Sequence, residues 1–228
     1  MTASDPTLTS TKDSAPKDFL PAMRFNFLTP FFDLVVRTTM RETRFKRALL
    51  DHAAIQPGHR VLDLGCGTGT LAILAKERTP SAEVVGLDGD PKILDLARAK
   101  SEAGVQVSFD HAYSTDLPYE AASFDRVLST LFFHHLTTND KRTTLEELAR
   151  VLKPGGQLHI VDFTKASGPL MALAFAVVRP FDGLERTRVN ARGELGAMVS
   201  GAGFDAVSEH KRLRTGFGTL GFLCATRP

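Results

Sequence analysis

The 228-residue chain contains no tryptophan and only two cysteines, and its net charge is just +2. Cys66 and Cys224 lie far apart in the sequence, so we find no disulfide framework and predict a reducing, cytoplasmic setting. The small net charge gives no support to a nucleic-acid partner. The longest apolar run, residues 170–178, is too short for a transmembrane helix, which needs about 20 residues.

The first residues, MTASDPTLTSTKDSAPKD, also lack the apolar core of a signal peptide, and we expect a disordered tail over residues 1–18. The chain as a whole is 43% hydrophobic, and its length fits one domain, which we predict over residues 19–228. Residues 19–56 combine apolar side chains at near-helical spacing with a basic side. This pattern predicts an N-terminal helical cap.

Strand-like and helix-like patterns alternate through residues 57–163, the predicted core. This alternation predicts an α/β fold with a doubly wound, mostly parallel, Rossmann-like sheet. Residues 164–204 are expected to be a substrate-covering insertion and helix. Residues 205–228 are expected to form an antiparallel hairpin, because a short Gly-Phe-Gly turn cannot carry a parallel crossover. The expected core strands are residues 59–65, 82–88, 105–111, 124–130 and 157–163, with helices at 70–78, 91–100 and 139–152.

The stretch VLDLGCGTG, residues 61–69, joins the first core strand to the first core helix, where open α/β sheets bind their ligands. A dinucleotide site has the pattern G-x-G-x-x-G, whereas the glycines here follow G-x-G-x-G and Thr70 replaces the late glycine. Asp63, just before the loop, is unsuited to a pyrophosphate and suited to a cation. Asp88 ends the second strand, where a carboxylate can accept hydrogen bonds from both ribose hydroxyls.

Four stretches follow one another at characteristic spacing: DLGCGTG, GLDGDPKIL, DLPYEAASFDRVLSTLFFHHL and LARVLKPGGQLHIVDF. Over residues 60–163 the chain resembles class I S-adenosylmethionine-dependent methyltransferases, most closely those of ubiquinone/menaquinone biosynthesis. The resemblance implies S-adenosyl-L-methionine as cofactor, S-adenosyl-L-homocysteine as product and a small-molecule acceptor. The sulfonium and ammonium of this cofactor suit Asp63, and its carboxylate suits a helix N-terminus.

The same resemblance assigns Asp63, Gly65 and Gly67 to the methionine part of the cofactor and Asp88 to its ribose. Tyr113 and Ser114 replace the acid-small pair with which this family meets the adenine amino group, so Asp116 or a backbone group is the expected substitute. Gly89 stands where an apolar residue usually packs on the adenine, and Cys66 is interpreted as a small loop residue. The predicted cofactor-binding residues are Asp63, Gly65, Cys66, Gly67, Asp88, Gly89, Tyr113, Ser114, Asp116 and Thr130.

The residues after the fourth strand bear on the acceptor. Neither the Asn/Asp-Pro-Pro-Tyr/Phe signature of amino-methyltransferases nor the Pro-Cys motif of cytosine-C5 enzymes is present, which disfavours a nucleic-acid substrate. His134 and His135 are candidates for a general base or for residues that orient the acceptor. The competing interpretation is a scaffold pair with one ring hydrogen-bonded into the core, and both stay open. A hydrophobic or aromatic acceptor (quinol-, phenol-, amine- or lipid-head-group-like) is predicted to contact Phe27, Phe31, Phe32, Phe133 and Phe175.

Two other classes of function stay open. A nicotinamide-dependent oxidoreductase shares the sheet, but Asp63 and the missing late glycine argue against it. A non-catalytic interaction protein could keep the cofactor pocket without the chemistry. Arg37, Arg41 and Arg44 could meet an anionic membrane surface, although a solvated face is the commoner role of such charges. No metal-binding set is predicted, and the sequence says nothing about the oligomeric state.

Overall fold

The structure is a computed structural model that describes residues 42–101 and 104–228 of the chain. The predicted tail, most of the helical cap, and with them Phe27, Phe31 and Phe32, lie outside the described residues. The strands are β1 (Arg60–Leu64), β2 (Glu83–Asp88), β3 (Ser108–His111), β4 (Phe124–Thr130), β5 (Leu152–Phe163), β6 (Asp205–Thr215) and β7 (Gly218–Thr226). The helices are α2 (Glu42–Ala53), α3 (Thr70–Arg78), α4 (Pro91–Ser101), the short 3-10 helix η1 (Phe133–His135), α5 (Thr138–Val151), α6 (Pro169–Asp182), α7 (Arg188–Arg192) and α8 (Leu195–Gly201).

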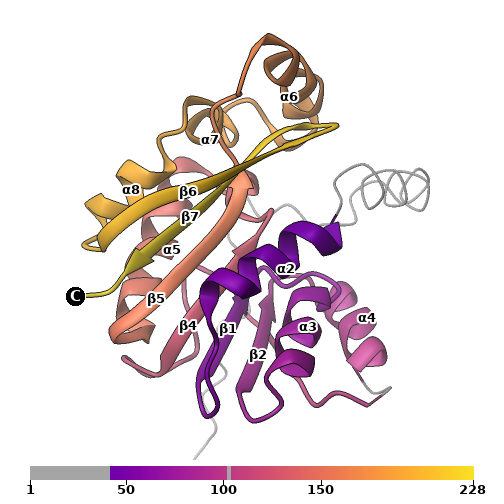
Figure 1. The fold of residues 1–228 in the computed structure, drawn as a ribbon, viewed down its shortest axis with the longest axis vertical. Coiled ribbons are helices and arrows are strands. Elements are labelled where there is room, and N and C mark those ends of the chain that lie inside the picture. The colour runs from indigo at the N-terminus through magenta and orange to yellow at the C-terminus, as the bar shows by residue number, and fades with distance from the viewer. Residues whose placement is uncertain (1–41, 102–103) are drawn as a thin grey trace, which may run out of the picture.

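Within the described residues, the strands form one seven-stranded sheet in the order β3-β2-β1-β4-β5-β7-β6. The strands from β3 to β5 are parallel, whereas β7 pairs antiparallel with both β5 and β6. Helices cover both faces, with α2, α3 and α4 packed on one and α5 and α8 on the other (Figure 1). The predicted doubly wound, mostly parallel sheet with an antiparallel end is confirmed.

The alternation of side chains along each strand divides the core into two layers. Val61 of β1 packs with Phe45 of α2 and Leu71 of α3 on one face. Leu62 of β1 packs with Leu145 of α5 on the other. Each fully buried leucine contributes roughly 1.5–3 kcal/mol to folding. By the same alternation, Asp63 points to the face that carries α3, and this places a carboxylate beside the N-terminal turn of that helix.

Local signals set most element boundaries. Asp90 Oδ1 accepts a hydrogen bond from the Lys92 amide at 3.0 Å, so the predicted cap and Pro91 start α4 as expected. The helix before residues 153–156 stops at Val151, but these residues belong to β5 instead of forming a free turn. Gly155 has a φ of +75°, and the β4–β5 register shifts between Phe124 and Arg126, so the strand begins irregularly.

The segment between β5 and β6 contains α6, α7 and α8, and its role as a substrate-covering insertion stays a prediction. Figure 1 shows α6 and α7 beyond the end of the sheet where β5 finishes. No helix in residues 42–101 or 104–228 is long and apolar enough to cross a membrane.

Candidate functional site

The glycine loop follows β1 and lies against β2. The amides of Gly65 and Cys66 both donate to the Leu87 carbonyl oxygen, at 2.8 and 3.0 Å. Gly65, Gly67 and Gly69 have φ values of +68°, +53° and +71°, which lie in the left-handed region that glycine enters at little cost. The alternating glycines thus let the chain reverse tightly between β1 and α3.

Gly65 is also needed for space. A Cβ at this position would lie 2.3 Å from Cδ2 of Phe132, whereas a Cβ at Gly67 would meet nothing within 4 Å. Phe132 reaches the loop because Leu131, just after β4, has a φ of +53°, an uncommon conformation for a branched residue. The segments that follow β1 and β4 therefore pack against each other at Gly65, whereas no described residue occupies the space beside Gly67.

Asp63 has an incompletely satisfied carboxylate. Its Oδ2 accepts a hydrogen bond from the Ala72 amide at 3.0 Å, and its side chain is buried. Among the described residues, Asp63 Oδ1 and Asn190 Oδ1 are the buried side-chain polar atoms that have no hydrogen-bond partner. Burial raises the pKa of Asp63 to about 7, although the charge of Lys46 acts in the opposite direction. An ammonium group beside Oδ1 would supply both the missing hydrogen bond and the opposite charge.

Asp88, at the end of β2, links the loop to α4. Its Oδ2 accepts from the Gly67 amide at 2.9 Å and its Oδ1 accepts from the Asp90 amide at 3.0 Å. Burial raises the pKa of Asp88, and these two backbone hydrogen bonds limit the rise. Each carboxylate oxygen can accept a further hydrogen bond, so the geometry fits a ligand with neighbouring hydroxyls, such as a ribose.

The remaining predicted cofactor residues lie at the same end of the sheet, but their side chains differ in burial and in hydrogen bonding. Ser114 Oγ is buried and hydrogen-bonded to Thr144 Oγ1 at 2.8 Å, so its side chain is held by α5. Asp116 is exposed, and Gly89 contributes its carbonyl to His111 Nε2 at 3.1 Å. Tyr113 and Thr130 are half-buried. The side chain of Ser114 is thus already engaged in a hydrogen bond, whereas that of Asp116 is exposed, and the adenine contact stays a prediction.

Cys66 is buried between the glycine loop and β2, where its Sγ would lie 3.0 Å from a Cβ added to Gly86. Burial raises the pKa of the thiol, and the nearby charges of Asp63 and Asp88 raise it further. A protonated, buried thiol is a poor nucleophile. This environment agrees with the interpretation of Cys66 as a small loop residue.

His134 belongs to η1, at the carboxyl ends of β4 and β5, and is buried. Its Nδ1 lies 2.7 Å from Asp162 Oδ1, and its backbone amide donates to Asp162 Oδ2 at 3.2 Å. Burial alone would lower the pKa of His134, but the charge and hydrogen bond of Asp162 outweigh it and raise the pKa. A carboxylate beside Nδ1 favours the tautomer with its proton on that nitrogen, so Asp162 orients the ring and leaves Nε2 available to accept a proton.

Asp182, at the end of α6, lies on the other side of the same imidazole. Its Oδ2 is 3.9 Å from His134 Nε2, and its Oδ1 is 3.4 Å from His135 Nδ1. The side chain of His135 is 46% exposed, compared with 5% for His134, so the two histidines are not equivalent. A buried imidazole between two carboxylates, with a path to solvent through the second one, is equipped to receive and release a proton.

The predicted substrate contacts are placed differently. Phe133, the first residue of η1, turns its side chain into the core and is fully buried, so the structure does not support its role as an acceptor contact. Phe175 of α6 is buried too, but its ring stacks on Phe163 at a centroid distance of 4.4 Å. Phe163 in turn contacts the ring of His134 edge-on at 5.0 Å. Phe175 therefore supports the ring of Phe163, which packs against His134.

Three residues around the site, Lys46, Asp162 and Asp182, were not among the candidates predicted from the sequence. Asp162 was visible as the acid at the end of the expected fifth strand, the edge at which open α/β sheets bind ligands. Asp182 gave no comparable signal, because only the fold of the insertion brings α6 to the histidines.

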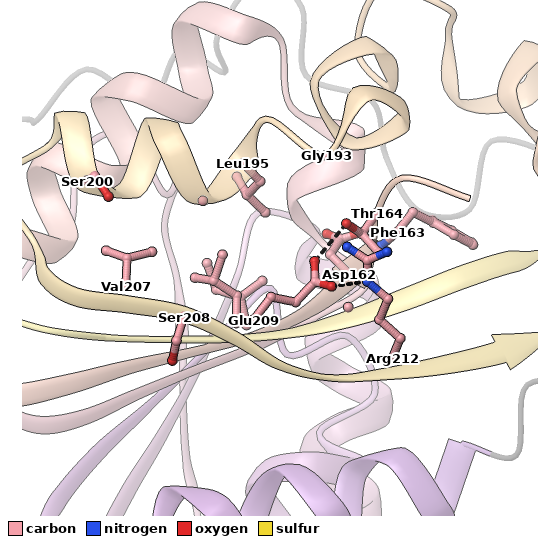
Figure 2. Close-up of a pocket in the computed structure, with 14 residues that line it drawn as sticks. Asp162, Phe163, Thr164, Gly193, Leu195, Ser200, Val207, Ser208, Glu209 and Arg212 are labelled. Atoms are coloured by element: carbon pink, nitrogen blue, oxygen red, sulfur yellow. Dashed lines mark hydrogen bonds and ion pairs between the residues drawn. The ribbon is translucent and has the colours of Figure 1, made fainter. Parts of the chain in front are cut away.

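A separate cavity of about 310 Å³ lies between β6, β7 and the α7–α8 segment (Figure 2). Its charged groups are already paired, since Glu209 accepts from Thr164 Oγ1 at 2.9 Å and from the Arg212 guanidinium. Its lining includes Asp162 but no residue of the glycine loop. The cavity is thus distinct from the site around Asp63 and Asp88.

Comparisons with known proteins agree with this geometry. A family described as a methyltransferase domain matches residues 61–156. A demethylmenaquinone methyltransferase of Thermus thermophilus is 39% identical over 166 residues, which cover 70% of this chain and 74% of that protein. An uncharacterised methyltransferase of Synechocystis is 33% identical over 169 residues, which cover 74% of this chain and 77% of that protein.

Solved structures share the fold at lower identity. The YcgJ protein of Bacillus subtilis superposes with a TM-score of 0.63 at 20% identity, over 80% of this chain and 97% of its own. A phosphoethanolamine N-methyltransferase of Haemonchus contortus, in complex with S-adenosylhomocysteine, gives a TM-score of 0.67 at 17% identity, over 81% of this chain and 52% of its own. The enzyme class and the cofactor predicted from the motifs are confirmed. The chain belongs to the class I S-adenosylmethionine-dependent methyltransferases of the ubiquinone/menaquinone-biosynthesis type.

Proposed function

We propose that this methyltransferase acts on a hydrophobic, hydroxyl-bearing aromatic acceptor of the quinol class, with His134 as general base. The observation that carries the proposal is the buried Asp162–His134–Asp182 arrangement at the carboxyl ends of β4 and β5. A phenolic hydroxyl is a weak nucleophile until it loses its proton, and the loss activates both its oxygen and the conjugated ring carbons. The name of the Thermus thermophilus relative points to the same class of acceptor.

When bound, S-adenosylmethionine supplies a methyl group on a positively charged sulfur, which is already activated for in-line displacement. Asp63 would hold the ammonium end through its unpartnered Oδ1, and Asp88 would hold the ribose. His134 Nε2 accepts the acceptor's hydroxyl proton while Asp162 keeps the proton on Nδ1. Asp182 stabilises the resulting imidazolium and passes the proton toward solvent beside His135. Positioning of the two reactants supplies the largest share of the acceleration, on the order of 7–11 kcal/mol.

The surface next to this site is apolar. Helix α6 exposes an apolar stripe, defined here as Leu170, Leu173, Val177 and Phe181, with exposed fractions of 71%, 65%, 63% and 69%. The spacing of three and four residues puts these side chains on one side of the helix. The stripe lies on the face of α6 opposite Phe175, on the same helix whose last residue, Asp182, lies beside the histidines, and it suits the apolar part of a quinol.

The test is a methyl-transfer assay with a short-chain demethylmenaquinol, compared with phosphoethanolamine, and read as S-adenosylhomocysteine released. We expect turnover of the quinol only. His134→Gln should lower kcat by about 10²–10⁴-fold, the usual contribution of a general base, with little change in S-adenosylhomocysteine affinity. His135→Gln is the matched control and should retain most of the activity, because this ring is half exposed.

The pH dependence separates a base from a scaffold residue. A base must be deprotonated, so kcat should rise with pH through the elevated pKa of His134. Asp162→Asn removes the charge that raises this pKa and should move the inflection to lower pH while reducing kcat. An unchanged kcat in His134→Gln would leave the histidines with only a scaffold role, and preferred turnover of phosphoethanolamine would contradict the quinol proposal.

The residue assignments are part of the same proposal. The cofactor set includes Gly65, Gly67 and Thr130 beside the two aspartates, and the domain is taken as residues 19–228. The cytoplasmic location and the lack of a nucleic-acid partner stay predictions.

A further inference from the structure

Three strands and one helix bring four metal-ligand side chains together away from the glycine loop. His52 is the penultimate residue of α2, and His159 lies in the middle of β5, where its direct cross-strand neighbour on β7 is Cys224. His210 of β6 stacks on His52 with ring centroids 3.6 Å apart and planes at 8°. His52 and His159 are separated by 107 positions, so no local spacing motif revealed the cluster.

The distances are those of a metal site. His52 Nδ1 lies 3.3 Å from His159 Nδ1, and the ligand atoms of His52, His159 and Cys224 all lie within 4.8 Å of one another. Two nitrogen ligands of a tetrahedral zinc ion, each about 2.0–2.1 Å from the metal, are about 3.3 Å apart. The observed separation of the two ring nitrogens therefore matches a shared tetrahedral ion.

The rings are also held in the required orientation. His159 Nε2 lies 3.3 Å from the Gln157 side-chain carbonyl, which favours the tautomer with the proton on Nε2 and a lone pair on Nδ1, the nitrogen that faces His52. This is the usual arrangement around a ligating histidine, whose second nitrogen donates to an oxygen acceptor. His52 is exposed, so the cluster is reached from solvent.

We propose that His52, His159 and Cys224 bind one Zn²⁺ ion and so attach the end of α2 to strands β5 and β7. Neutral imidazole and thiolate are ligands that favour this ion, and the fourth position is open to water from the exposed side. On binding, the Cys224 thiol transfers its proton to solvent as the sulfur–zinc bond forms. Arg126 of β4 donates to the Ala53 carbonyl oxygen at 2.9 Å, which holds the residue after His52 against the sheet.

The full chain, stripped of metal with a chelator, is titrated with Co²⁺ as the spectroscopic probe and then with Zn²⁺. We expect one equivalent of Co²⁺ to bind, with visible ligand-field bands and a thiolate-to-cobalt charge-transfer band that Zn²⁺ removes. Cys224→Ser should abolish the charge-transfer band. His52→Ala should weaken binding about tenfold or more, the loss that even a supporting residue of a metal site causes.

Cys66→Ser is the matched control, because Cys66 lies in the glycine loop, and it should keep the charge-transfer band. His52→Ala removes an exposed side chain, so its fold should persist, and far-ultraviolet circular dichroism checks this. Zn²⁺ should raise the melting temperature of the wild type but not of His52→Ala. No saturable Co²⁺ binding, or an unchanged band in Cys224→Ser, would overturn the zinc site and leave a hydrogen-bonded histidine pair.

Discussion

Asp63 is buried at the end of β1, with Oδ2 bonded to the Ala72 amide and Oδ1 without a partner. Burial raises its pKa from 3.8 to about 7. The folded chain therefore holds this proton over a pH range in which the unfolded chain has released it. By linkage, the free energy of unfolding falls as the pH rises from about 4 to about 7, and the ionised carboxylate is destabilising above that range.

The first prediction concerns Asp63→Asn, which removes the charge and keeps the size. Without cofactor at pH 8, its melting temperature should equal or exceed that of the wild type. Its affinity for S-adenosylhomocysteine should fall about 10- to 100-fold, because a hydrogen bond to a charged group contributes about 1.5–3 kcal/mol. Calorimetric titration and thermal melts from pH 5 to 8 measure both effects. Unchanged affinity would remove Asp63 from the proposed contact with the ammonium group.

The second prediction compares two loop glycines with similar positive φ. Gly65→Ala should lower the free energy of unfolding more than Gly67→Ala, because only the first brings a Cβ within 2.3 Å of Phe132. Both variants incur backbone strain, and overpacking adds about 1–3 kcal/mol at Gly65. Chemical denaturation without cofactor measures the difference. Equal losses in the two variants would show that Phe132 yields freely and that only the backbone conformation matters.

At the scale of the element, α6 performs two tasks with different faces. Its buried face supplies Phe175, which stacks on Phe163, and its last residue, Asp182, lies beside the histidines. Its opposite face exposes the apolar stripe. A helix that leaves such a stripe to solvent gains little stability from it, so the residues there are free to serve a ligand.

The third prediction is that Leu173→Ser and Val177→Ser each raise KM for the quinol several-fold, with kcat and the melting temperature nearly unchanged. Each side chain is more than 60% exposed, so its loss opens no cavity. Leu96→Ser on α4 is the matched control, because Leu96 is 52% exposed but belongs to another helix. Steady-state kinetics with a short-chain demethylmenaquinol give both constants. If the α6 variants behave like Leu96→Ser, the acceptor does not follow the stripe.

At the scale of the whole molecule, the groups proposed to contact the cofactor come from separate strands and from the glycine loop. The Asp63 carboxylate accepts a hydrogen bond from the first turn of α3, and the Asp88 carboxylate accepts one from the Gly67 amide. Phe132, which follows β4, lies against Gly65. A ligand that binds all of these groups favours the folded chain over the unfolded one. Ligand binding should therefore be visible in global stability.

The fourth prediction uses this coupling to separate cofactor classes. S-adenosylhomocysteine at about 100 times its Kd should stabilise the fold by about 2.7 kcal/mol, a rise in melting temperature of roughly 5–10 °C for a domain of this size. NADH at the same concentration should produce no comparable rise, because the carboxylate of Asp63 is unsuited to a pyrophosphate. Differential scanning calorimetry compares the two. Stabilisation by NADH alone would contradict the cofactor assignment to this loop.

Local patterns predicted a large part of this protein. Strand β4 and helix α3 have the bounds expected from the sequence, because each is set by its own apolar pattern and flanking breakers. The spacing of Gly65, Gly67 and Gly69, with Asp63 before them, disfavoured a pyrophosphate and favoured a cationic ligand, because the loop and its acid are contiguous in the chain; the resemblance of four successive motifs then named the cofactor. The antiparallel end followed from the length of one turn, since a few residues can reverse a strand but cannot cross over to a parallel one.

The tertiary structure decided what depends on distant residues. The sequence could not tell that His134 is buried against Asp162 while His135 is exposed, or that Phe133 turns into the core. It could not place Asp182 at the histidines or bring His52 to His159, because these contacts form only when helices pack on the finished sheet. Short-range pattern determined the elements and the cofactor loop, whereas long-range packing determined which side chains share a proton or a metal ion.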